Sequence, residues 1–482
     1  MKKNSKKMRG EIYTPENIVK QILDGSWYLP STSGILEKHI MDNSCGKGAF
    51  LKEIVTRYVL SFANFKRGTQ DLLKEHLETY IHGIEINPDA CVECVEVLNK
   101  TLFDMGLDIR PSWDIKCENA LENHDYDGLM DFVVGNPPYV RVHNLKPNDD
   151  LYHTLKNYEF CKVGSTDLYI AFYELGFRML NETGTLCYIS PNGWLKGPAG
   201  RAFREYVREN KTLVSVFDNG HLKIFDGVTA YTSIFKFKKN ANVSFVYYTS
   251  NENSSEKLIP YGSMFIGDEI YLGENLDVLK SVLQYDGDKS VRVKNGLATL
   301  LDDFFIYPKP KFNGSILEVP IIKASTGEKK ICFIPHAETG DAIPLNTVRR
   351  LSEKAYKYVM ENEERLKKRD FDGEWYGIGR RQGLSDVMES KITVNNIIRD
   401  ENDLKINLAN GGTAVYSGFY ILFLKPEDSL KDITERYNKV VSALKSSDFV
   451  NYVKALKKYK SGGYYTFTAR QLEKFLNWKL AK

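Results

Sequence analysis

Short apolar runs alternate with amphipathic stretches between about residue 35 and residue 240, and this pattern predicts strands and helices in turn. The apolar runs predict the strands HIMDNS (39–44), YIHGIEI (80–86), LMDFVVG (129–135), TLCYIS (185–190), LVSVFD (213–218), AYTSIFKFK (230–238) and NVSFVYYT (242–249). The amphipathic stretches predict the helices GAFLKEIVTRYVLSFAN (48–64), PDACVECVEVLNKTLFDM (88–105), DLYIAFYELGFRMLN (167–181) and GRAFREYVREN (200–210). The last two strands are typical of a hairpin. The alternation as a whole predicts a doubly wound α/β sheet whose ligand lies beyond the carboxyl ends of the strands.

The pattern of apolar and polar residues changes near residue 250. The polar stretch SNENSSEK (250–257) is typical of a linker, and beyond it the periodicity is mixed, with Gly-rich turns. A chain of 482 residues is also too long for one ordinary hydrophobic core. We therefore expect two domains, residues 1–250 and residues 251–482.

Composition narrows the class of protein. Hydrophobic residues make up 42% of the chain and charged residues 27%, which excludes a disordered chain. The basic start is followed by no apolar signal segment, and no run of about 18 apolar residues occurs. Seven cysteines without framework spacing are typical of reduced thiols, and the CxxC of Cys91 and Cys94 lies inside a predicted helix with no second pair nearby. We expect a cytoplasmic protein with no membrane segment and no metal site.

Charge is distributed unevenly along the chain. Residues 321–482 carry 29 Lys and Arg against 21 Asp and Glu, whereas the remaining residues carry 37 against 42. A basic second half is typical of a nucleic-acid-binding module, because contacts with phosphates supply most non-specific affinity. Solvated Lys-rich helices such as VKALKKYK (453–460) account for part of the excess.

Three polar signals follow predicted strands in the first half. DNSCGKGAF (42–50) places an acidic residue and glycines before a helix, where the backbone can approach a ligand closely. Glu85 ends the next strand, where a carboxylate suits the two hydroxyls of a ribose, and Asn119 in CENAL (117–121) suits the edge of an adenine. Each signal alone is typical of a turn or a helix cap. Together they predict a nucleotide-like cofactor, either a dinucleotide or S-adenosylmethionine.

The stretch GNPPYVR (135–141) follows the next strand and contains no nucleophile, metal ligand or general acid. The side-chain oxygen of Asn136 and the carbonyl of Pro137 can accept both hydrogens of one amino group. Pro137 and Pro138 fix the backbone, and Tyr139 offers a flat ring on which a base can stack. The tip is therefore suited to hold a planar exocyclic amine.

Such an amine is a poor nucleophile, because its lone pair is delocalised into the ring. Two acceptors on its hydrogens favour a pyramidal nitrogen that can attack a methyl group in line, and the methylated nitrogen then loses its proton easily. Positioning and electrostatics suffice for this reaction. The tip therefore favours S-adenosylmethionine as the cofactor, and an amine in duplex DNA must first be turned out of the base stack.

The motifs and their order resemble those of the gamma-class N6-adenine DNA methyltransferases of restriction–modification systems. The similar segments are IYTPENIVKQIL (12–23), DNSCGKGAF (42–50), GIEI (83–86), ENAL (118–121), GNPPYVR (135–141), STDLYIAFYELG (165–176), GTLCYISPNGWL (184–195) and FDNGHLKIFDGVTAYTSIFKF (217–237). The chain departs from the family pattern at Asn43, Ser44, Lys47 and Asn119. The resemblance implies a Rossmann-like S-adenosylmethionine-dependent methyltransferase sheet with a C-terminal mixed α/β target-recognition domain.

The resemblance also implies roles for individual residues. The catalytic residues would be Asn136, Pro137, Pro138 and Tyr139. The cofactor-binding residues would be Tyr13, Thr14, Pro15, Asp42, Cys45, Gly46, Gly48, Glu85, Ile86, Asn119, Ala120 and Asn136. Tyr139 and Phe225 would hold the extruded adenine.

The second half resembles the family's target-recognition domain more loosely. The similar segments are VKNGLATLLDDFFI (293–306), EWYGIGRRQGL (374–384) and SGGYYTFTARQLEKFL (461–476). Arg380, Arg381 and Gln382 are candidates for contacts with phosphates or base edges. Packing of this turn into the core of its own domain is the alternative.

The expected function is transfer of a methyl group from S-adenosylmethionine to N6 of a flipped-out adenine in double-stranded DNA. The resemblance implies the modification component of a restriction–modification system, monomeric on DNA, with a separately encoded restriction endonuclease as a partner. Two other amine substrates stay open. N4 of cytosine could be served by the same acceptors, and protein glutamine N5-methyltransferases also use an NPPY tip, although they are much shorter.

Overall fold

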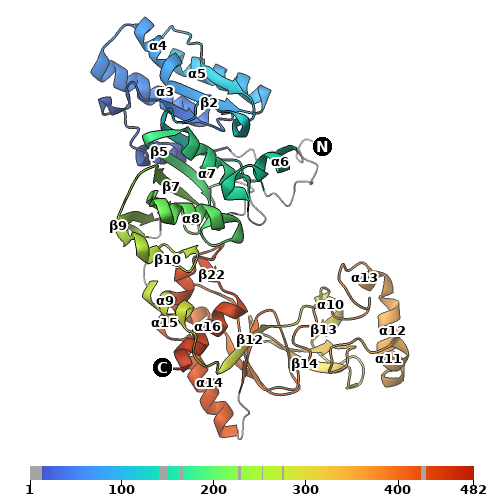
Figure 1. Ribbon diagram of the computed structural model, residues 1–482. Helices are drawn as coiled ribbons and strands as arrows, with labels where there is room; N and C mark the ends of the chain where they lie inside the picture. The colour runs from blue at the N-terminus through green and yellow to red at the C-terminus, as the bar shows by residue number, and fades with distance from the viewer. Residues whose placement is uncertain are drawn as a thin grey trace. The chain divides into compact units, whose positions relative to one another are not determined.

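The computed structural model describes residues 13–140, 150–162, 167–225, 230–251, 253–273, 276–424 and 430–482. The chain divides into two compact units, Met1–Gly273 and Glu274–Lys482 (Figure 1). Residues 253–260, within and just after the expected linker, form a strand at the edge of the first unit's sheet. The division between the units therefore falls beyond residue 250.

In its described residues the first unit contains a main sheet of nine strands and a small antiparallel pair, β10 (Phe265–Ile266) and β11 (Glu269–Ile270). The strands of the main sheet are β1 (Ile40–Asp42), β2 (Ile81–Glu85), β3 (Asp114–Cys117), β4 (Met130–Gly135), β5 (Leu180–Pro191), β6 (Leu213–Asp218), β7 (Thr232–Lys238), β8 (Phe245–Ser250) and β9 (Asn253–Pro260). Their spatial order is β3-β2-β1-β4-β5-β7-β6-β8-β9. The pairs among β1 to β5 are all parallel, so the carboxyl ends of these strands meet at one edge of the sheet.

Strand β7 does not form the predicted hairpin with β8. It lies between β5 and β6 and runs antiparallel to both, whereas β8 pairs in parallel with β6. The physical reason is burial, because Thr232 to Phe237 are all buried and such a strand needs hydrogen-bonding partners on both sides. A two-stranded hairpin would leave one edge of this strand unpaired.

Helices cover both faces of this sheet. They are α2 (Glu16–Gly25), α3 (Ala49–Ser61), α4 (Gln70–Tyr80), α5 (Pro88–Asp104), α6 (Asp150–Lys156), α7 (Leu168–Met179) and α8 (Arg201–Asn210). Successive residues of a strand point to opposite faces, so Val133 joins the core under α7 and α8, and Val134 joins the core under α2 to α5. The sheet is thus doubly wound, as the alternation of the sequence predicts.

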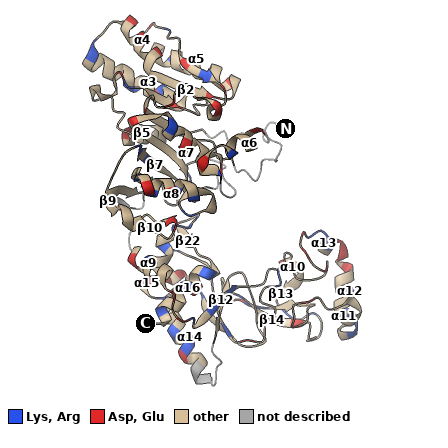
Figure 2. Ribbon diagram, viewed as in Figure 1, with Lys and Arg blue, Asp and Glu red and all other residues tan. Residues whose placement is uncertain are grey.

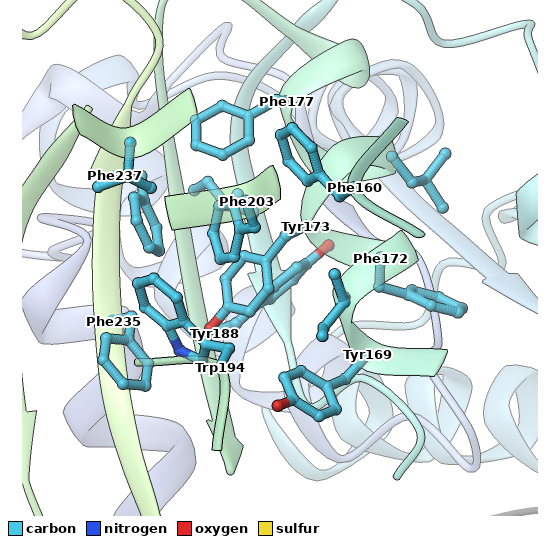
Figure 3. Close-up of a cluster of buried hydrophobic side chains, with 14 of the residues drawn as sticks. Phe160, Tyr169, Phe172, Tyr173, Phe177, Tyr188, Trp194, Phe203, Phe235 and Phe237 are labelled. Atoms are coloured by element: carbon cyan, nitrogen blue, oxygen red, sulfur yellow. The ribbon is translucent and has the colours of Figure 1, made fainter. Parts of the chain in front are cut away.

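An aromatic cluster fills the face under α7 and α8 (Figure 3). The ring of Phe203 packs 4.6 Å from Tyr173 and 4.5 Å from Trp194, measured between centroids. Tyr173 also shares a hydrogen bond of 2.7 Å with the hydroxyl of Ser190, near the carboxyl end of β5. This cluster gives the strand ends that carry the candidate site a well-packed support.

The second unit is mixed α/β. Its sheets have the strand orders β12-β20-β16-β18, β13-β15-β14-β19 and β17-β22-β21. The strands are β12 (Val291–Asn295), β13 (Ile306–Tyr307), β14 (Glu318–Lys323), β15 (Lys329–Phe333), β16 (Lys391–Val394), β17 (Ile397–Ile398), β18 (Ile406–Ala409), β19 (Ala414–Tyr416), β20 (Phe419–Phe423), β21 (Tyr459–Lys460) and β22 (Tyr464–Thr466). The helices are α9 (Leu276–Gln284), α10 (Asp302–Phe305), α11 (Leu345–Leu351), α12 (Glu353–Glu361), α13 (Glu363–Lys367), α14 (Leu430–Leu444), α15 (Ser447–Ala455) and α16 (Ala469–Leu480).

The basic excess of the second unit is spread over several of these elements. Figure 2 shows Lys and Arg on α14 and α16, for example, with acidic residues among them. Across the described ranges, no helix is long and apolar enough to pass through a bilayer.

Candidate functional site

The predicted site residues of the first unit follow the carboxyl ends of neighbouring strands. Asp42 ends β1, Glu85 ends β2 and Asn136 follows β4. Because β1 pairs in parallel with both β2 and β4, these three residues belong to the same edge of the sheet. The structure therefore brings together residues that lie up to about 95 positions apart in the sequence.

The loop after β1 is closed by backbone hydrogen bonds to Glu85. The Glu85 carboxylate accepts the N–H of Gly46 at 2.9 Å and the N–H of Asn87 at 2.8 Å. Gly48 precedes α3 with φ at +85°, and a Cβ on it would lie 2.9 Å from the sulfur of Cys94. Only glycine fits both the conformation and the space at this position. A carboxylate has about four acceptor positions, so Glu85 retains acceptors for a ligand.

Asp42 is buried at the junction of β1 and β4. Its carboxylate accepts the N–H of Ser44 at 3.1 Å, and a Cβ on Gly135 would lie 2.8 Å from Oδ1. Burial raises the pKa of Asp42 to about 7; the Ser44 hydrogen bond opposes this rise and the negative charge of Glu85 adds to it. Two carboxylates at one edge of the sheet, one of them buried, are suited to a ligand that carries positive charge.

Asn136 presents an unsatisfied acceptor. Its amide nitrogen donates to the hydroxyl of Thr14 at 3.1 Å, and Thr14 is itself buried. Its side-chain oxygen Oδ1 is buried and has no hydrogen-bond partner among the described residues. A buried oxygen left in this state costs about 1–3 kcal/mol, so the site is suited to a ligand that brings a donor to Oδ1.

Tyr139 stands among aromatic rings. Its hydroxyl donates to the carbonyl of Ile189 on β5 at 3.2 Å, and burial raises its pKa well above the ordinary value, so it is a neutral phenol. The rings of Tyr169 and Phe225 meet it edge-on, with centroids 6.2 Å and 6.1 Å away. Tyr139 is only partly buried, whereas Phe225 is buried. The three rings can form the wall of a pocket for a flat group.

The tip and the segment around Phe225 continue into residues outside the described ranges. These are Arg141 at the end of the catalytic motif, Ser165 and Thr166 of the next motif, and residues 226–229 after Phe225. The similarity of these residues to the family stays a prediction.

The remaining predicted cofactor residues lie in different environments. Tyr13 is 79% exposed, and Pro15 directly precedes α2. Cys45 and Ala120 are buried, whereas Ile86 is 65% exposed just after β2. An exposed apolar side chain beside Glu85 is suited to cover the face of a nucleobase.

Asn119 acts as the cap of a short helical turn (Ala120–Glu122). Its oxygen accepts the N–H of Leu121 at 3.2 Å, and its amide nitrogen donates to Glu122 at 2.9 Å. Both ends of this amide thus have local partners. Its predicted contact with an adenine edge stays a prediction.

Two residues of the site were not predicted from the sequence. Tyr169 lies edge-on to Tyr139, but its position on the apolar helix α7 is typical of a core residue. Tyr188 donates from its hydroxyl to Oδ1 of Asn43 at 2.9 Å, and both residues are buried. Asn43 is one of the departures from the family pattern, and this hydrogen bond gives it a structural role.

The cysteines of the CxxC motif pack behind the loop. Cys94 lies against Gly48, and the sulfur of Cys91 donates to the carbonyl of Glu85 at 3.4 Å. No cluster of three or more His, Cys, Asp or Glu suited to a metal ion occurs within the part of the chain that the structure describes.

Arg380, Arg381 and Gln382 belong to the second unit. All three side chains are exposed at a turn between α13 and β16. Because the neighbouring Ile378 and Leu384 are buried, the flanks of this turn pack into the unit and its tip faces solvent.

Comparison with known families matches the first unit. Residues 51–225 match the family described as the Eco57I restriction-modification methylase. This range includes Glu85, Asn136, Tyr139 and Phe225, and it begins at the third residue of α3.

Curated proteins of restriction–modification systems are similar to the chain. The type II methyltransferase M.BstVI of Geobacillus stearothermophilus is 28% identical over 345 residues, which cover 63% of this chain and 61% of that protein. The type II restriction enzyme and methyltransferase RM.Eco57I of Escherichia coli is 23% identical over 521 residues, covering 85% of this chain and 52% of that protein. The chain thus spans less than two thirds of the length of these relatives.

Solved structures share the fold over most of the chain. The Type IIL restriction-modification enzyme MmeI, solved in complex with DNA, has a TM-score of 0.59 at 15% identity, covering 94% of this chain and 63% of that one. A nuclease-deletion mutant of the Type ISP enzyme LlaGI, solved with a DNA substrate mimic, has a TM-score of 0.53 at 12% identity, covering 94% of this chain and 52% of that one. With the sheet order above, these similarities confirm the predicted fold class, a Rossmann-like α/β sheet followed by a mixed α/β C-terminal unit.

Proposed function

We propose that this protein is a DNA methyltransferase that transfers a methyl group from S-adenosylmethionine to N6 of an adenine turned out of double-stranded DNA. The observation that carries the proposal is the buried Oδ1 of Asn136, which has no hydrogen-bond partner among the described residues and lies three residues before Tyr139, whose ring meets that of Phe225. An exocyclic amine is the group that brings both a donor for this oxygen and a flat ring for these aromatic side chains.

Asn136 is held in place from its other end. Because its amide nitrogen donates to the buried Thr14, the side chain cannot turn without leaving that hydroxyl unpaired. Oδ1 therefore stays available to accept one hydrogen of the amine, and the Pro137 carbonyl accepts the other. The two acceptors favour the pyramidal nitrogen that carries out the attack, so a strong base is not required.

The loop residues fit S-adenosylmethionine. When bound, this cofactor supplies an electrophilic methyl group on a positively charged sulfur. Glu85 would hold its ribose hydroxyls, Thr14 and the neighbouring Tyr13 and Pro15 its methionine part, and the exposed Ile86 its adenine. Asp42, whose burial is costly when the carboxylate is charged, would gain a cationic neighbour.

The aromatic wall supports a nucleobase rather than an aliphatic amide as substrate. Tyr139 and Phe225 present ring surface, and stacking on an aromatic ring contributes about 1–3 kcal/mol per base. A glutamine side chain offers no such ring face. Both adenine and cytosine carry an exocyclic amine, and the motif order favours adenine.

The second unit would then bind the target sequence. Its Lys and Arg supply phosphate contacts, and the exposed Arg380, Arg381 and Gln382 are suited to base edges. The similarity to restriction–modification methyltransferases supports a role as the modification component of such a system. We propose that the protein acts as a monomer on DNA, in the cytoplasm, together with a separately encoded restriction endonuclease.

Methyl transfer from labelled S-adenosylmethionine tests this function. The protein is incubated in turn with unmodified plasmid, a protein release factor and total RNA, and we expect label only in the plasmid. Label in the release factor or the RNA would contradict the DNA substrate. Plasmid already methylated by the protein serves as the control and is expected to take up no further label.

A further inference from the structure

The exposed turn of the second unit is anchored on both sides, by the half-buried Arg369 before it and the buried Lys391 after it. At its start, Arg380 and Ala298 exchange backbone hydrogen bonds of 2.8 Å and 3.4 Å. The guanidinium of Arg381 reaches the carbonyl of Gly340 at 3.4 Å, and the structure records no side-chain hydrogen bond for Arg380 or Gln382 within the described ranges. The side chains at the tip are thus largely uncommitted, whereas their backbone is fixed.

The first anchor is Arg369, just after α13. Its guanidinium donates to the carbonyls of Thr299 at 2.8 Å, Trp375 at 2.6 Å and Gly377 at 2.8 Å. No carboxylate lies within ion-pair distance of Arg369 in the described part of the chain. Its hydrogen bonds therefore go to backbone atoms. They connect the segment that leads into the turn with Thr299, in the loop after β12.

His336 adds a second tie to the same segment. Its Nε2 accepts the N–H of Ile378 at 2.8 Å, and its Nδ1 donates to the carbonyl of Gly340 at 3.0 Å. Ile378 is only two residues before Arg380. The entry to the turn is thus held by two side chains whose hydrogen bonds go to backbone atoms, and the guanidinium of Arg369 also lies over the rings of Phe305 and Phe371.

The second anchor, Lys391, lies after the turn. It is the first residue of β16 and is 2% exposed. Its ammonium donates to the carbonyls of Asp386 and Val387, the latter at 3.1 Å. The carboxylate of Asp386 accepts from Lys294 and from the hydroxyl of Tyr420, each at 2.6 Å. The exit of the turn is thus fixed through both the backbone and the side chain of Asp386.

Placing a charged side chain at either anchor position costs free energy that packing alone would not require. Burial lowers the pKa of Lys391 to about 8 and that of Arg369 to about 10, because a charged group loses its hydration inside a protein. An apolar side chain of similar size would fill either position at lower cost. Cations that satisfy several carbonyls at once instead hold a loop in one conformation.

We propose that Lys391 and Arg369 are positioning residues of a preorganised DNA-reading turn, which fix the backbone of residues 377–387 so that Arg380, Arg381 and Gln382 meet base edges in one register. The inference rests on the proposed function. It assigns sequence discrimination to anchors that do not themselves contact DNA, since reading groups need support to hold their geometry. Loss of an anchor should therefore reduce sequence discrimination at one or two base pairs and leave the rate of the methyl-transfer step unchanged.

The test compares Lys391→Met with the wild type and with Lys405→Met, an exposed lysine just before β18 of the same sheet. The wild-type site is first mapped by single-molecule sequencing of DNA from cells that express the protein. Initial rates are then measured on duplexes that carry this site and each of its single-base variants. For Lys391→Met we expect kcat within about 3-fold of wild type and discrimination reduced about 10-fold or more at one or two positions, as a misplaced base contact implies.

A double-mutant cycle separates positioning from general loosening of the unit. If Lys391 acts through the turn, Lys391→Met should cause little further loss of discrimination in a chain that already carries Arg380→Ala and Gln382→Ala. Because Lys391 is buried, the salt dependence of KM should also keep its wild-type slope, unlike that of a lost phosphate contact. Additive losses of discrimination, or a reduced salt slope, would overturn the inference.

Other outcomes remain distinguishable. If Lys391→Met discriminates as well as the wild type, this inference fails while the proposed function stands. If the wild-type chain methylates no DNA, the proposed function fails and takes the inference with it. Should Lys391→Met not fold, Tyr420→Phe removes only one hydrogen bond from Asp386, and the same loss of discrimination is expected at smaller magnitude; full discrimination there would count against the anchors.

Discussion

Replacing Asp42 with asparagine should stabilise the protein without its cofactor, although Asp42 belongs to the cofactor loop. The pKa of this carboxyl rises from its ordinary value of 3.8 to about 7 because it is buried, so the folded state resists ionisation that the unfolded state undergoes freely. Between these two pH values stability falls by about 1.4 kcal/mol per pH unit, and above pH 7 the full cost of about 4 kcal/mol is present. Asparagine carries no charge and retains an oxygen for the N–H of Ser44.

The expected gain of Asp42→Asn over wild type is therefore about 1.5 kcal/mol at pH 5 and up to about 4 kcal/mol at pH 8.5. Urea unfolding of the cofactor-free protein at both pH values measures it. Asp104→Asn, at an exposed carboxylate on α5, is the control and should show no such dependence on pH. A variant that is less stable than wild type at pH 8.5, or a gain that is the same at both pH values, would refute the reasoning.

The same group predicts how cofactor affinity changes with pH. A cationic cofactor offsets the charge of ionised Asp42, so wild-type affinity for S-adenosylmethionine should rise as the pH passes through about 7. Calorimetry at pH 6 and pH 8 should show this rise in the wild type and its loss in Asp42→Asn. A rise of equal size in the variant would assign the pH dependence to another group.

Three further predictions follow from the site. Asn136→Ala should lower the rate of methyl transfer about 100-fold or more, because the reacting group loses one preorganised partner, while calorimetry should show a cofactor affinity within about 3-fold of wild type. The control Asn240→Ala, at an exposed site, should behave as wild type. Equal loss of cofactor binding and methyl transfer would assign Asn136 to the cofactor. Tyr139→Ala should reduce the fluorescence rise of 2-aminopurine at the target by weakening stacking about 1–3 kcal/mol. Tyr139→Phe should retain this rise, because it keeps the ring and removes only the hydroxyl that donates to the carbonyl of Ile189. Gly48→Ala should weaken cofactor binding, because the new Cβ would lie 2.9 Å from the sulfur of Cys94 and the residue would have to keep a φ of +85°. Adding Cys94→Ala removes the close contact but not the backbone strain, so it should restore only part of the affinity. Full restoration would show that the backbone conformation of the loop does not matter.

The positions of the site residues along the chain could be predicted, because these residues lie at the ends of predicted strands. Apolar runs ending in Asp42, Glu85 and Gly135 are local features, and in a parallel sheet their carboxyl ends must meet at one edge. Asn136 and Tyr139 were identified by their residue types alone. Their burial and partners, including Thr14 and Ile189, depend on contacts between distant segments and could not be predicted.

The errors in the predicted fold have the same origin. Strands β7 and β8 are neighbours in the sequence, and nothing local indicates that β6 lies between them. The polar stretch after residue 250 is an edge strand whose described side chains are mostly exposed, with the 54% exposed Leu258 next to the buried Ile259. Composition alone does not separate such an edge strand from a linker.

Buried charged residues were the hardest feature to predict. Lys391 opens a strand that could equally have been exposed, and only the fold places it under the turn of Arg380 to Gln382. Tyr169 was not predicted as a site residue, because an aromatic residue on an apolar helix is typical of a hydrophobic core. Both residues gain their proposed roles from segments far away in the sequence.

Mass spectrometry of nucleosides from plasmid treated with the protein and S-adenosylmethionine tests the central claim most directly. The site predicts that N6-methyladenine appears with the wild-type protein and falls to background with Asn136→Ala, although that variant still binds the cofactor. N4-methylcytosine as the product, or undiminished N6-methyladenine with Asn136→Ala, would contradict the account.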